Sequence, residues 1–535
     1  MKKLILFYAL LCAGAANAQN TAPDTSIKLI AQKENVINAE TIVKAENIGT
    51  QINTQLAELR PTISADGNLL FFIVENHPQN TTYNRVRNSQ DIWYSFRDKD
   101  GKWGPAEHME HPLNTYFYNA VYWISPDNSR ILIRNAFVNG EYAGNGVSMS
   151  KLQKDGTWTK PEALRIKNFH KYDLGRQNGA TMANDGRTLL LYLCTQKGGY
   201  NNDIYMCSLQ PDGSWSEPKN LGKKINLEKQ NEMTPYLASD GVTLYFSSNR
   251  PGGKGDNDIW MAKRLDDSWT KWSDPVNLQA PINTEDWDAF FTMDAGGEYA
   301  YMSSNLNSIG ESDIVRIKLF EQEKPNPVVL VHGNVYNKKT GKPLSASLIY
   351  ETLPDGAVAG NGTSNDIDGS FRIVLPYDKN YSIRATADKF FAVSENLNLD
   401  SLVKVGYKEI HKDLYLVPIE IGSVVRLNNV FFDFDKWDLR PESFVELDRV
   451  VKLLQENPAI VIEMSAHTDS RGADDYNFRL SDNRARSVME YILSKGVDPA
   501  RISSKGYGET KPVVENDTDE NRQLNRRVEF VIVKN

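Results

Sequence analysis

A short turn followed by an alternating strand decides the fold of the first half of the chain: Ser239-Asp240-Gly241, then Thr243-Leu244-Tyr245-Phe246-Ser247. Asp-Gly accepts the positive φ angles of a tight hairpin turn, and the strand presents alternate side chains to a neighbouring sheet. A second strand, Asp258-Ile259-Trp260, and a further tryptophan, Trp272, follow. The same features recur along the chain, so this stretch is one unit of an internal repeat.

The repeat has a nearly constant period over the first 320 residues. The central apolar residue of the second strand recurs at intervals of 55, 57, 55 and 55 residues, at Ile92, Val147, Ile204, Ile259 and Ile314. Short strands at a constant period, with one aromatic residue per unit, are typical of a β-propeller blade. We therefore predict an all-β propeller over residues 19–320, with five blades favoured and six possible if residues 19–45 contribute more.

The two ends of the repeat region are predicted to meet. The fifth unit stops near Leu319 without its tryptophan strand, and residues 48–54 match segments that close other units, such as residues 280–284. We therefore expect the N-terminal strand to complete the last blade and close the ring. The units resemble the PD40/WD40-like propeller repeats of the periplasmic protein TolB. Because the repeat region carries no catalytic motif, we interpret the propeller as a binding surface.

A second all-β region follows a polar, proline-bearing linker at residues 321–328. Residues 329–417 contain strand-like runs separated by Gly, Asp and Pro turns, which predicts a β-sandwich. The motifs Gly333-x-Val335, Asp368-Gly369-Ser370-Phe371 and Tyr381-Ser382-Ile383 resemble the carboxypeptidase regulatory-like (transthyretin-like) domain. The resemblance implies a structural or adhesive role, and no chemistry is assigned to this region.

The hydrophobic periodicity changes in residues 418–535. Apolar residues at helical spacing predict amphipathic helices at residues 440–457 and 474–495. Strands are predicted at residues 459–465 and 528–533, and an earlier first strand is predicted to end at residues 431–435, which gives the order β-α-β-α-β. Together these elements predict an α+β domain at the C-terminal end of a multidomain chain.

Two charged residues in this region form a candidate binding site. Arg484 lies at the edge of the apolar face of the second predicted helix, so its guanidinium should be partly buried and require an anion. Asp469 stands in a Thr-Asp-x-x-Gly turn in front of that helix. A cation beside an anion complements the zwitterionic end of an amino acid. The alternative is a structural ion pair between Asp469 and Arg484.

Three motifs surround these residues: His467-Thr468-Asp469-x-x-Gly472, Asn477-x-x-Leu480-Ser481-x-x-Arg484-Ala485 and Asn525-Arg526-Arg527-Val528. They resemble the OmpA C-terminal (OmpA/Pal/MotB) peptidoglycan-binding family. The resemblance implies that Asp469 and Arg484 hold the diaminopimelate of the peptidoglycan stem peptide. Positions that line the same groove in the family are matched by Thr468, Asn477 and Asp435, whereas His467 is expected to be structural.

The N-terminus predicts export from the cytoplasm. Lys2 and Lys3, a short apolar run and an A-x-A site make residues 1–18 a secretory signal peptide. Bulky Leu11 argues against lipidation at Cys12. Two cysteines would remain in the mature chain, and both are predicted to be buried thiols and not a disulfide; they are Cys194 and Cys207.

Composition and motifs exclude several classes of function. The chain has 61 Lys and Arg against 69 Asp and Glu, so its net charge of −8 argues against nucleic acid as a partner. The long apolar run within residues 1–18 is too short to span a bilayer. The sequence lacks G-x-S-x-G, and His108-Met109-Glu110-His111 differs from the metalloprotease H-E-x-x-H spacing. No catalytic residue, metal site or cofactor is predicted.

The domain order resembles the peptidoglycan-associated PorE-type proteins of type IX secretion systems, although residues 19–35 leave no room for their N-terminal TPR region. We therefore predict a non-enzymatic periplasmic scaffold associated with the cell wall and peripheral to the outer membrane at most. It would bind peptidoglycan through its C-terminal domain and envelope or secretion-system proteins through its propeller, anchoring a type IX secretion complex. The alternative is a propeller-based envelope sensor, sugar-binding protein or hydrolase.

Overall fold

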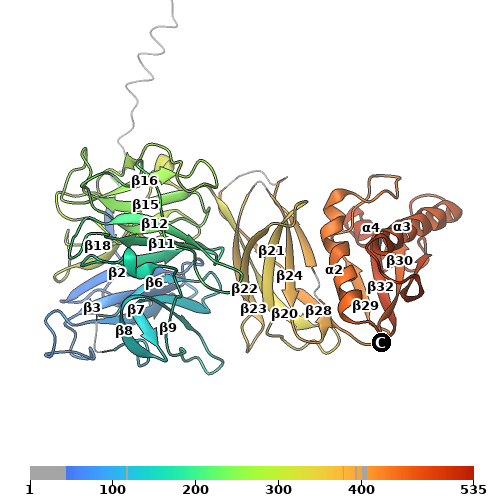
Figure 1. Ribbon diagram of the computed structural model, residues 1–535, viewed down its shortest axis with the longest axis horizontal. Helices are drawn as coiled ribbons and strands as arrows, with labels where there is room; N and C mark the ends of the chain where they lie inside the picture. Colours follow the sequence, from blue (N-terminus) through green and yellow to red (C-terminus); the bar gives the residue numbers. More distant parts are fainter. Residues whose placement is uncertain (1–43, 116–117, 378, 392–393, 401–405) are drawn as a thin grey trace, which may run out of the picture. The chain divides into compact units, whose positions relative to one another are not determined.

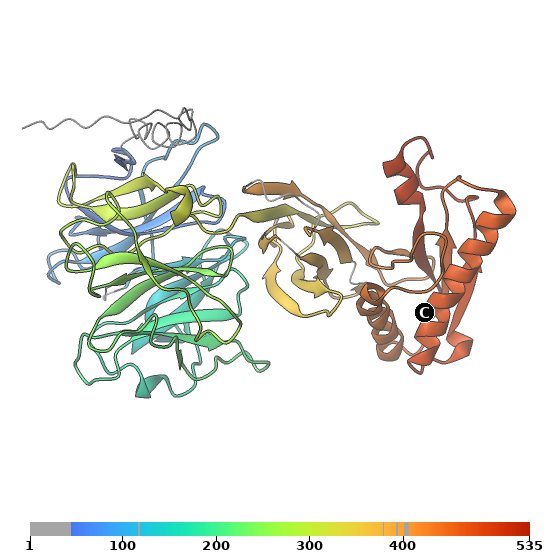
Figure 2. The same ribbon diagram turned by 90° about the horizontal axis from the view of Figure 1, so that it is seen from above.

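The computed structural model describes residues 44–115, 118–377, 379–391, 394–400 and 406–535. The predicted signal peptide and Cys12 lie outside the described residues. The chain is multidomain and mostly β, and its described α-helices gather in the C-terminal part (Figure 1, Figure 2). In the described part of the chain, none of the helices combines the length and the apolar character needed to cross a membrane.

Five small antiparallel sheets follow one another along residues 45–318, which we call the five-sheet region. The first sheet contains β2 (Ala57–Ile63), β3 (Leu69–Glu75), β4 (Gln90–Phe96) and β5 (Glu107–His108). The second contains β6 (Val121–Ile124), β7 (Arg130–Val138), β8 (Glu141–Lys151) and β9 (Glu162–Ala163). The third contains β10 (Gly179–Met182), β11 (Thr188–Leu193), β12 (Asp203–Ser208) and β13 (Lys219–Asn220). The fourth contains β14 (Glu232–Leu237), β15 (Thr243–Ser248), β16 (Asp258–Lys263) and β17 (Val276–Asn277).

The fifth sheet joins the two ends of this region. It consists of β18 (Tyr299–Ser304), β19 (Asp313–Lys318) and β1 (Ala45–Asn47), with Ala45 opposite Ile317. Asn53 then donates a hydrogen bond to the carbonyl of Ile314 at 2.8 Å and accepts one from its amide at 2.9 Å. The predicted contact between the N-terminal segment and the last repeat is therefore present. The strand that pairs with β19 is β1, which lies just before residues 48–54. The segment 48–54 contributes Asn53.

The Asp-Ile pattern of the repeat has a structural cause. In the fourth sheet, the carboxylate of Asp258 accepts hydrogen bonds from the backbone amides of Lys254 at 2.6 Å and Gly255 at 3.1 Å. It also accepts one from Asn277 at 2.8 Å. The side chain thus accepts hydrogen bonds from backbone amides of the loop that precedes its strand. Burying these amides without a partner would be costly. The corresponding pairs in other sheets are Asp203 with Asn220 and Asp313 with Asn47.

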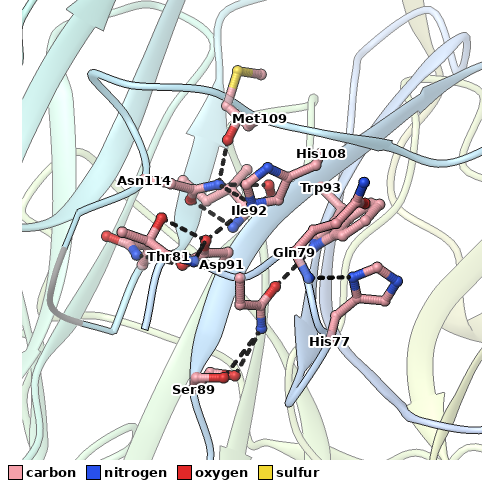
Figure 3. Close-up of polar contacts among 12 residues, drawn as sticks. His77, Gln79, Thr81, Ser89, Asp91, Ile92, Trp93, His108, Met109 and Asn114 are labelled. Atoms are coloured by element: carbon pink, nitrogen blue, oxygen red, sulfur yellow. Dashed lines mark hydrogen bonds and ion pairs between the residues drawn. The ribbon is translucent and has the colours of Figure 1, made fainter. Parts of the chain in front are cut away.

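The first sheet carries a histidine at the asparagine position. Figure 3 shows His108 beside Asp91, with Nε2 2.9 Å from Oδ2. Asp91 also accepts from the backbone amide of Thr81 at 2.6 Å, as Asp258 does from its own loop. The His108–Asp91 pair is therefore the variant of a repeated structural contact.

Apolar residues of adjacent sheets pack into shared cores. One cluster joins Leu190 and Tyr192 of β11 to Leu244 and Phe246 of β15. Full burial of a side chain such as Phe246 stabilises the fold by about 1.5–3 kcal/mol. The two cysteines of the region, Cys194 and Cys207, are buried free thiols, as predicted. Burial raises the pKa of the Cys207 thiol to about 12, so it stays protonated and unreactive.

Two further sheets share one core in the middle of the chain. Strand order in the first is β23-β20-β28-β25, with β27 also paired to β20, and in the second β22-β21-β24-β26. Their bounds are β20 (Val328–Asn337), β21 (Ser347–Leu353), β22 (Val358–Thr363), β23 (Ser370–Pro376), β24 (Asn380–Thr386), β25 (Phe390–Phe391), β26 (Ser394–Asn398), β27 (Lys408–His411) and β28 (Leu414–Pro418). Val335, Tyr350 and Phe371 belong to the buried cluster that these sheets contribute to.

The C-terminal region is an α+β domain, as predicted, with more elements than the sequence indicated. In chain order these are β29 (Val424–Leu427), α2 (Phe444–Glu456), β30 (Val461–His467), α3 (Asp474–Ser494), β31 (Ile502–Gly506), α4 (Asp519–Asn525) and β32 (Arg527–Lys534). The predicted end of the domain's first strand is wrong, because the strand stops at Leu427 and residues 433–435 lie exposed in the following loop. The sheet order is β29-β32-β30-β31, with β30 and β31 parallel. Leu447 of α2 and Val488 of α3 are fully buried in its core.

Candidate functional site

The five predicted site residues come from three segments of the C-terminal region. Thr468 and Asp469 follow the last residue of β30 directly, and Asn477 and Arg484 lie on α3. Asp435 lies in the loop between β29 and α2. The negative charges of Asp435 and Asp469 both act to raise the pKa of the Arg484 guanidinium, against the lowering by burial. The fold therefore gathers the predicted charges in one place.

Asp469 is a buried anion held by its turn. The residue is 7% exposed, and its Oδ1 accepts a hydrogen bond from the backbone amide of Arg471 at 3.0 Å. Its Oδ2 is paired with Nη1 of Arg526. Sequence reasoning missed Arg526 as a site residue, although the Asn525-Arg526-Arg527-Val528 motif contained the signal.

Arg484 is half-buried and carries no carboxylate partner. Its Nε donates to the carbonyl of Lys436 at 2.9 Å, and its guanidinium lies 5.0 Å from the centre of the Phe432 ring. Burial lowers the pKa of Arg484, as does the charge of Arg526, whereas the nearby acids oppose both effects. Among the described residues no acid lies within ion-pair distance of Arg484, so the alternative of a structural bridge to Asp469 is absent.

The remaining predicted residues differ in accessibility. Asn477 is 2% exposed and donates to Oε2 of Glu509 at 2.6 Å and to the carbonyl of Asp469 at 3.3 Å. It therefore fixes the turn. Thr468 is also buried, and its Oγ1 has no hydrogen-bond partner within the described chain. Asp435, in contrast, is exposed and adopts a left-handed φ of 58°.

His467 belongs to the support of the site. Its ring is 3% exposed, stacks on Tyr507 at a centroid distance of 5.3 Å, and lies 3.4 Å from Oε2 of Glu529. Burial acts to raise the pKa of Glu529, but the contacts with His467 and Arg527 outweigh it and lower this pKa to about 2. The histidine therefore lies against an acid in the sheet that is charged at neutral pH.

A basic pocket of about 260 Å³ adjoins Arg484. Its arginine lining comprises Arg426, Arg440, Arg484, Arg526 and Arg527. A guanidinium with no carboxylate partner can take a carboxylate through two parallel hydrogen bonds. Asp435 can accept an ammonium group nearby. Within the described residues no group of three or more metal-ligating side chains is present.

Comparison with known proteins finds one family model and several relatives that match part of the chain. The OmpA family model matches residues 431–526. An outer membrane porin F from Pseudomonas fluorescens is 42% identical over 110 residues, which are 20% of this chain and 34% of the porin. A peptidoglycan-associated lipoprotein from Haemophilus influenzae is 37% identical over 102 residues, which are 19% of this chain and 67% of the lipoprotein.

One solved structure, the periplasmic domain of Helicobacter pylori MotB, is 30% identical and covers 21% of this chain and 85% of that domain, with a TM-score of 0.19. The chain spans about a third of the length of the porin. The lipoprotein, in contrast, is covered over two thirds of its length. Through residues 431–526, the chain belongs to the OmpA family.

Proposed function

We propose that this chain is a non-enzymatic periplasmic protein that anchors to the cell wall by binding peptidoglycan through residues 418–535. The family and the relatives support a place in the cell envelope, since they include outer-membrane and peptidoglycan-associated proteins. One observation carries the proposal. The guanidinium of Arg484 is half-buried and lacks a carboxylate partner among the described residues, yet it lies within the field of Asp435 and Asp469.

The chemistry of that arrangement fits the diaminopimelate of a stem peptide. The free end of this residue carries an ammonium group and a carboxylate on the same carbon. Arg484 would take the carboxylate, and the carboxylates of Asp435 and Asp469 would attract the ammonium. Thr468 and Asn477 would keep the turn in place. Since a charge-assisted hydrogen bond contributes about 1.5–3 kcal/mol, the guanidinium alone should account for a tenfold or larger change in affinity.

Co-sedimentation of the full chain with purified diaminopimelate-type peptidoglycan tests this function. Wild type should bind, and Arg484→Ala should bind at least tenfold more weakly. Arg486→Ala is a matched control, because Arg486 lies two residues further along α3 and is exposed. Equal binding by the two variants, or no binding by wild type, would overturn the proposal. Circular dichroism shows whether each variant is folded.

The five-sheet region and the middle sheets would hold protein partners. We propose that residues 19–320 form a five-bladed β-propeller, supported by five sheets in chain order and by the pairing of β1 with β19. Residues 329–417 would form a carboxypeptidase regulatory-like sandwich after a linker at residues 321–328. Envelope proteins, including those of a type IX secretion complex, are the proposed partners.

A further inference from the structure

A narrow cavity runs among the strands that open the sheets of the five-sheet region. Its volume is about 70 Å³, room for roughly five water-sized spheres. Residues of β2, β6, β10 and β14 line it, together with residues 290–293 before β18. Four of the sheets and the segment before the fifth thus contribute to one cavity, which lies in a different part of the chain from Asp469 and Arg484.

Arg60 is the charged residue of this lining. The guanidinium carbon of Arg60 lies 4.9 Å from the centre of the Tyr122 ring and 4.1 Å from that of Phe290. The side chain is half-buried, and among the described residues no acid lies within ion-pair distance of it. Among the described residues of the lining, none is an Asp or a Glu. A guanidinium that contacts two aromatic rings and has no acidic partner can bind an anion that accepts its hydrogen bonds.

The repeat itself does not require an arginine here. Arg60, Thr234 and Phe290 share a left-handed backbone, with φ values of 51°, 44° and 61°. In β2 and β14 this residue lies within a register shift of the strand pairing. Thr234 and Phe290 show that uncharged side chains support the same backbone feature. The backbone conformation therefore does not explain why residue 60 is charged, and we look for a binding role instead.

Two buried polar groups in the lining lack partners. Trp123 is 6% exposed and Thr234 is 9% exposed, and neither the indole Nε1 nor the hydroxyl Oγ1 has a hydrogen-bond partner in the described chain. An indole N–H can only donate, and a hydroxyl can donate or accept. With Arg60, three residues of the lining carry groups able to donate. An unpartnered buried donor is costly, so each favours an acceptor.

The geometry points to a carboxylate-binding site in this cavity, which accepts a single carboxylate on a narrow apolar stem. The carboxylate would take hydrogen bonds from Arg60, and the rings of Tyr122 and Phe290 would contact the stem. The small volume excludes a bulky anion. A peptide C-terminus and a free short-chain acid share this chemistry.

Calorimetric titration of the full chain tests the site. The probes are N-acetyl-Ala-Ala-Leu with a free C-terminal carboxylate, the same peptide as its C-terminal amide, and acetate. The acetyl group removes the ammonium that the C-terminal site would use. We expect the free acid to bind at least tenfold more tightly than the amide. Binding by acetate at comparable affinity would identify a free short-chain acid as the source, and weaker acetate binding would identify a peptide.

Three variants separate this site from other effects. Arg60→Asn removes the charge and tolerates the left-handed backbone, and it should lower free-acid affinity at least tenfold. Arg176→Asn is the control, because Arg176 also lies over a ring, that of Tyr200, but is exposed. Arg484→Ala should leave affinity unchanged. The inference is overturned if acid and amide bind equally, if no probe binds at millimolar concentration, or if folded Arg60→Asn binds as wild type does.

Discussion

Glu58 should make the stability of the five-sheet region fall as pH rises. The side chain is fully buried, and its carboxylate accepts hydrogen bonds from the Thr54 backbone amide at 3.0 Å and hydroxyl at 2.6 Å. Burial raises the pKa of Glu58 from 4.5 to about 7, against the effect of these hydrogen bonds. The folded chain therefore keeps a proton that the unfolded chain releases.

The size of the effect follows from the pKa change. At about 1.4 kcal/mol for each pH unit, a rise from 4.5 to about 7 corresponds to about 3 kcal/mol. Because the folded-state pKa of this acid is raised, the cost is absent below pH 4.5 and grows until pH exceeds about 7. Glu58→Gln removes it. An amide suits the position, since Asn119 of the second sheet accepts the same two hydrogen bonds from Thr115.

Urea denaturation of the full chain, followed by tryptophan fluorescence, measures this difference. Nine of the ten tryptophans lie in residues 45–318, so the signal reports on the five-sheet region. Glu58→Gln should be more stable than wild type by about 3 kcal/mol at pH 8 and by less than about 1 kcal/mol at pH 5. Glu162→Gln, at an exposed position of β9, should match wild type throughout. A Glu58→Gln difference that does not change with pH would refute the reasoning.

Two further substitutions probe other buried contacts. Glu529 has the opposite shift, since its contacts with His467 and Arg527 lower its pKa from 4.5 to about 2. Glu529→Gln should therefore cost about 3 kcal/mol at pH 7 in urea denaturation followed by helical circular dichroism, because the described α-helices lie in the C-terminal region, and the loss should disappear as pH falls from 4.5 to about 2. Asn53→Ala breaks both hydrogen bonds to Ile314. It should lower the free energy of unfolding by about 1–3 kcal/mol, and an unchanged urea midpoint would contradict this role.

Local patterns made much of the fold predictable. The 55–57-residue period located the repeated strands, because each unit repeats the same turn and the same alternation. Helical spacing located α2 and α3, although α2 begins at Phe444 after a 3₁₀ turn and not at residue 440. The short β31 and α4 were missed, since their positions depend on tertiary contacts more than on periodicity.

The partners of the site residues were harder to predict. Asp469 was expected to face Arg484 or a ligand, but it is paired with Arg526, 57 residues away in sequence. The choice between two arginines depends on how α3 and the segment before β32 pack, which side-chain spacing within one helix cannot reveal. The pairing of His108 with Asp91 was also not predicted. His108 is recognised as the equivalent of Asn277 only when the first and fourth sheets are compared strand by strand.

The most direct test of the proposed function compares two muropeptides that differ in one carboxylate. Diaminopimelate differs from lysine by the carboxylate at the end of its side chain, the group assigned to Arg484. Titration of the full chain should show at least tenfold tighter binding of the diaminopimelate muropeptide than of its lysine counterpart. Arg484→Ala should remove most of that difference. Equal affinity of wild type for both muropeptides would contradict the assignment of Arg484 and the proposed anchoring to the cell wall.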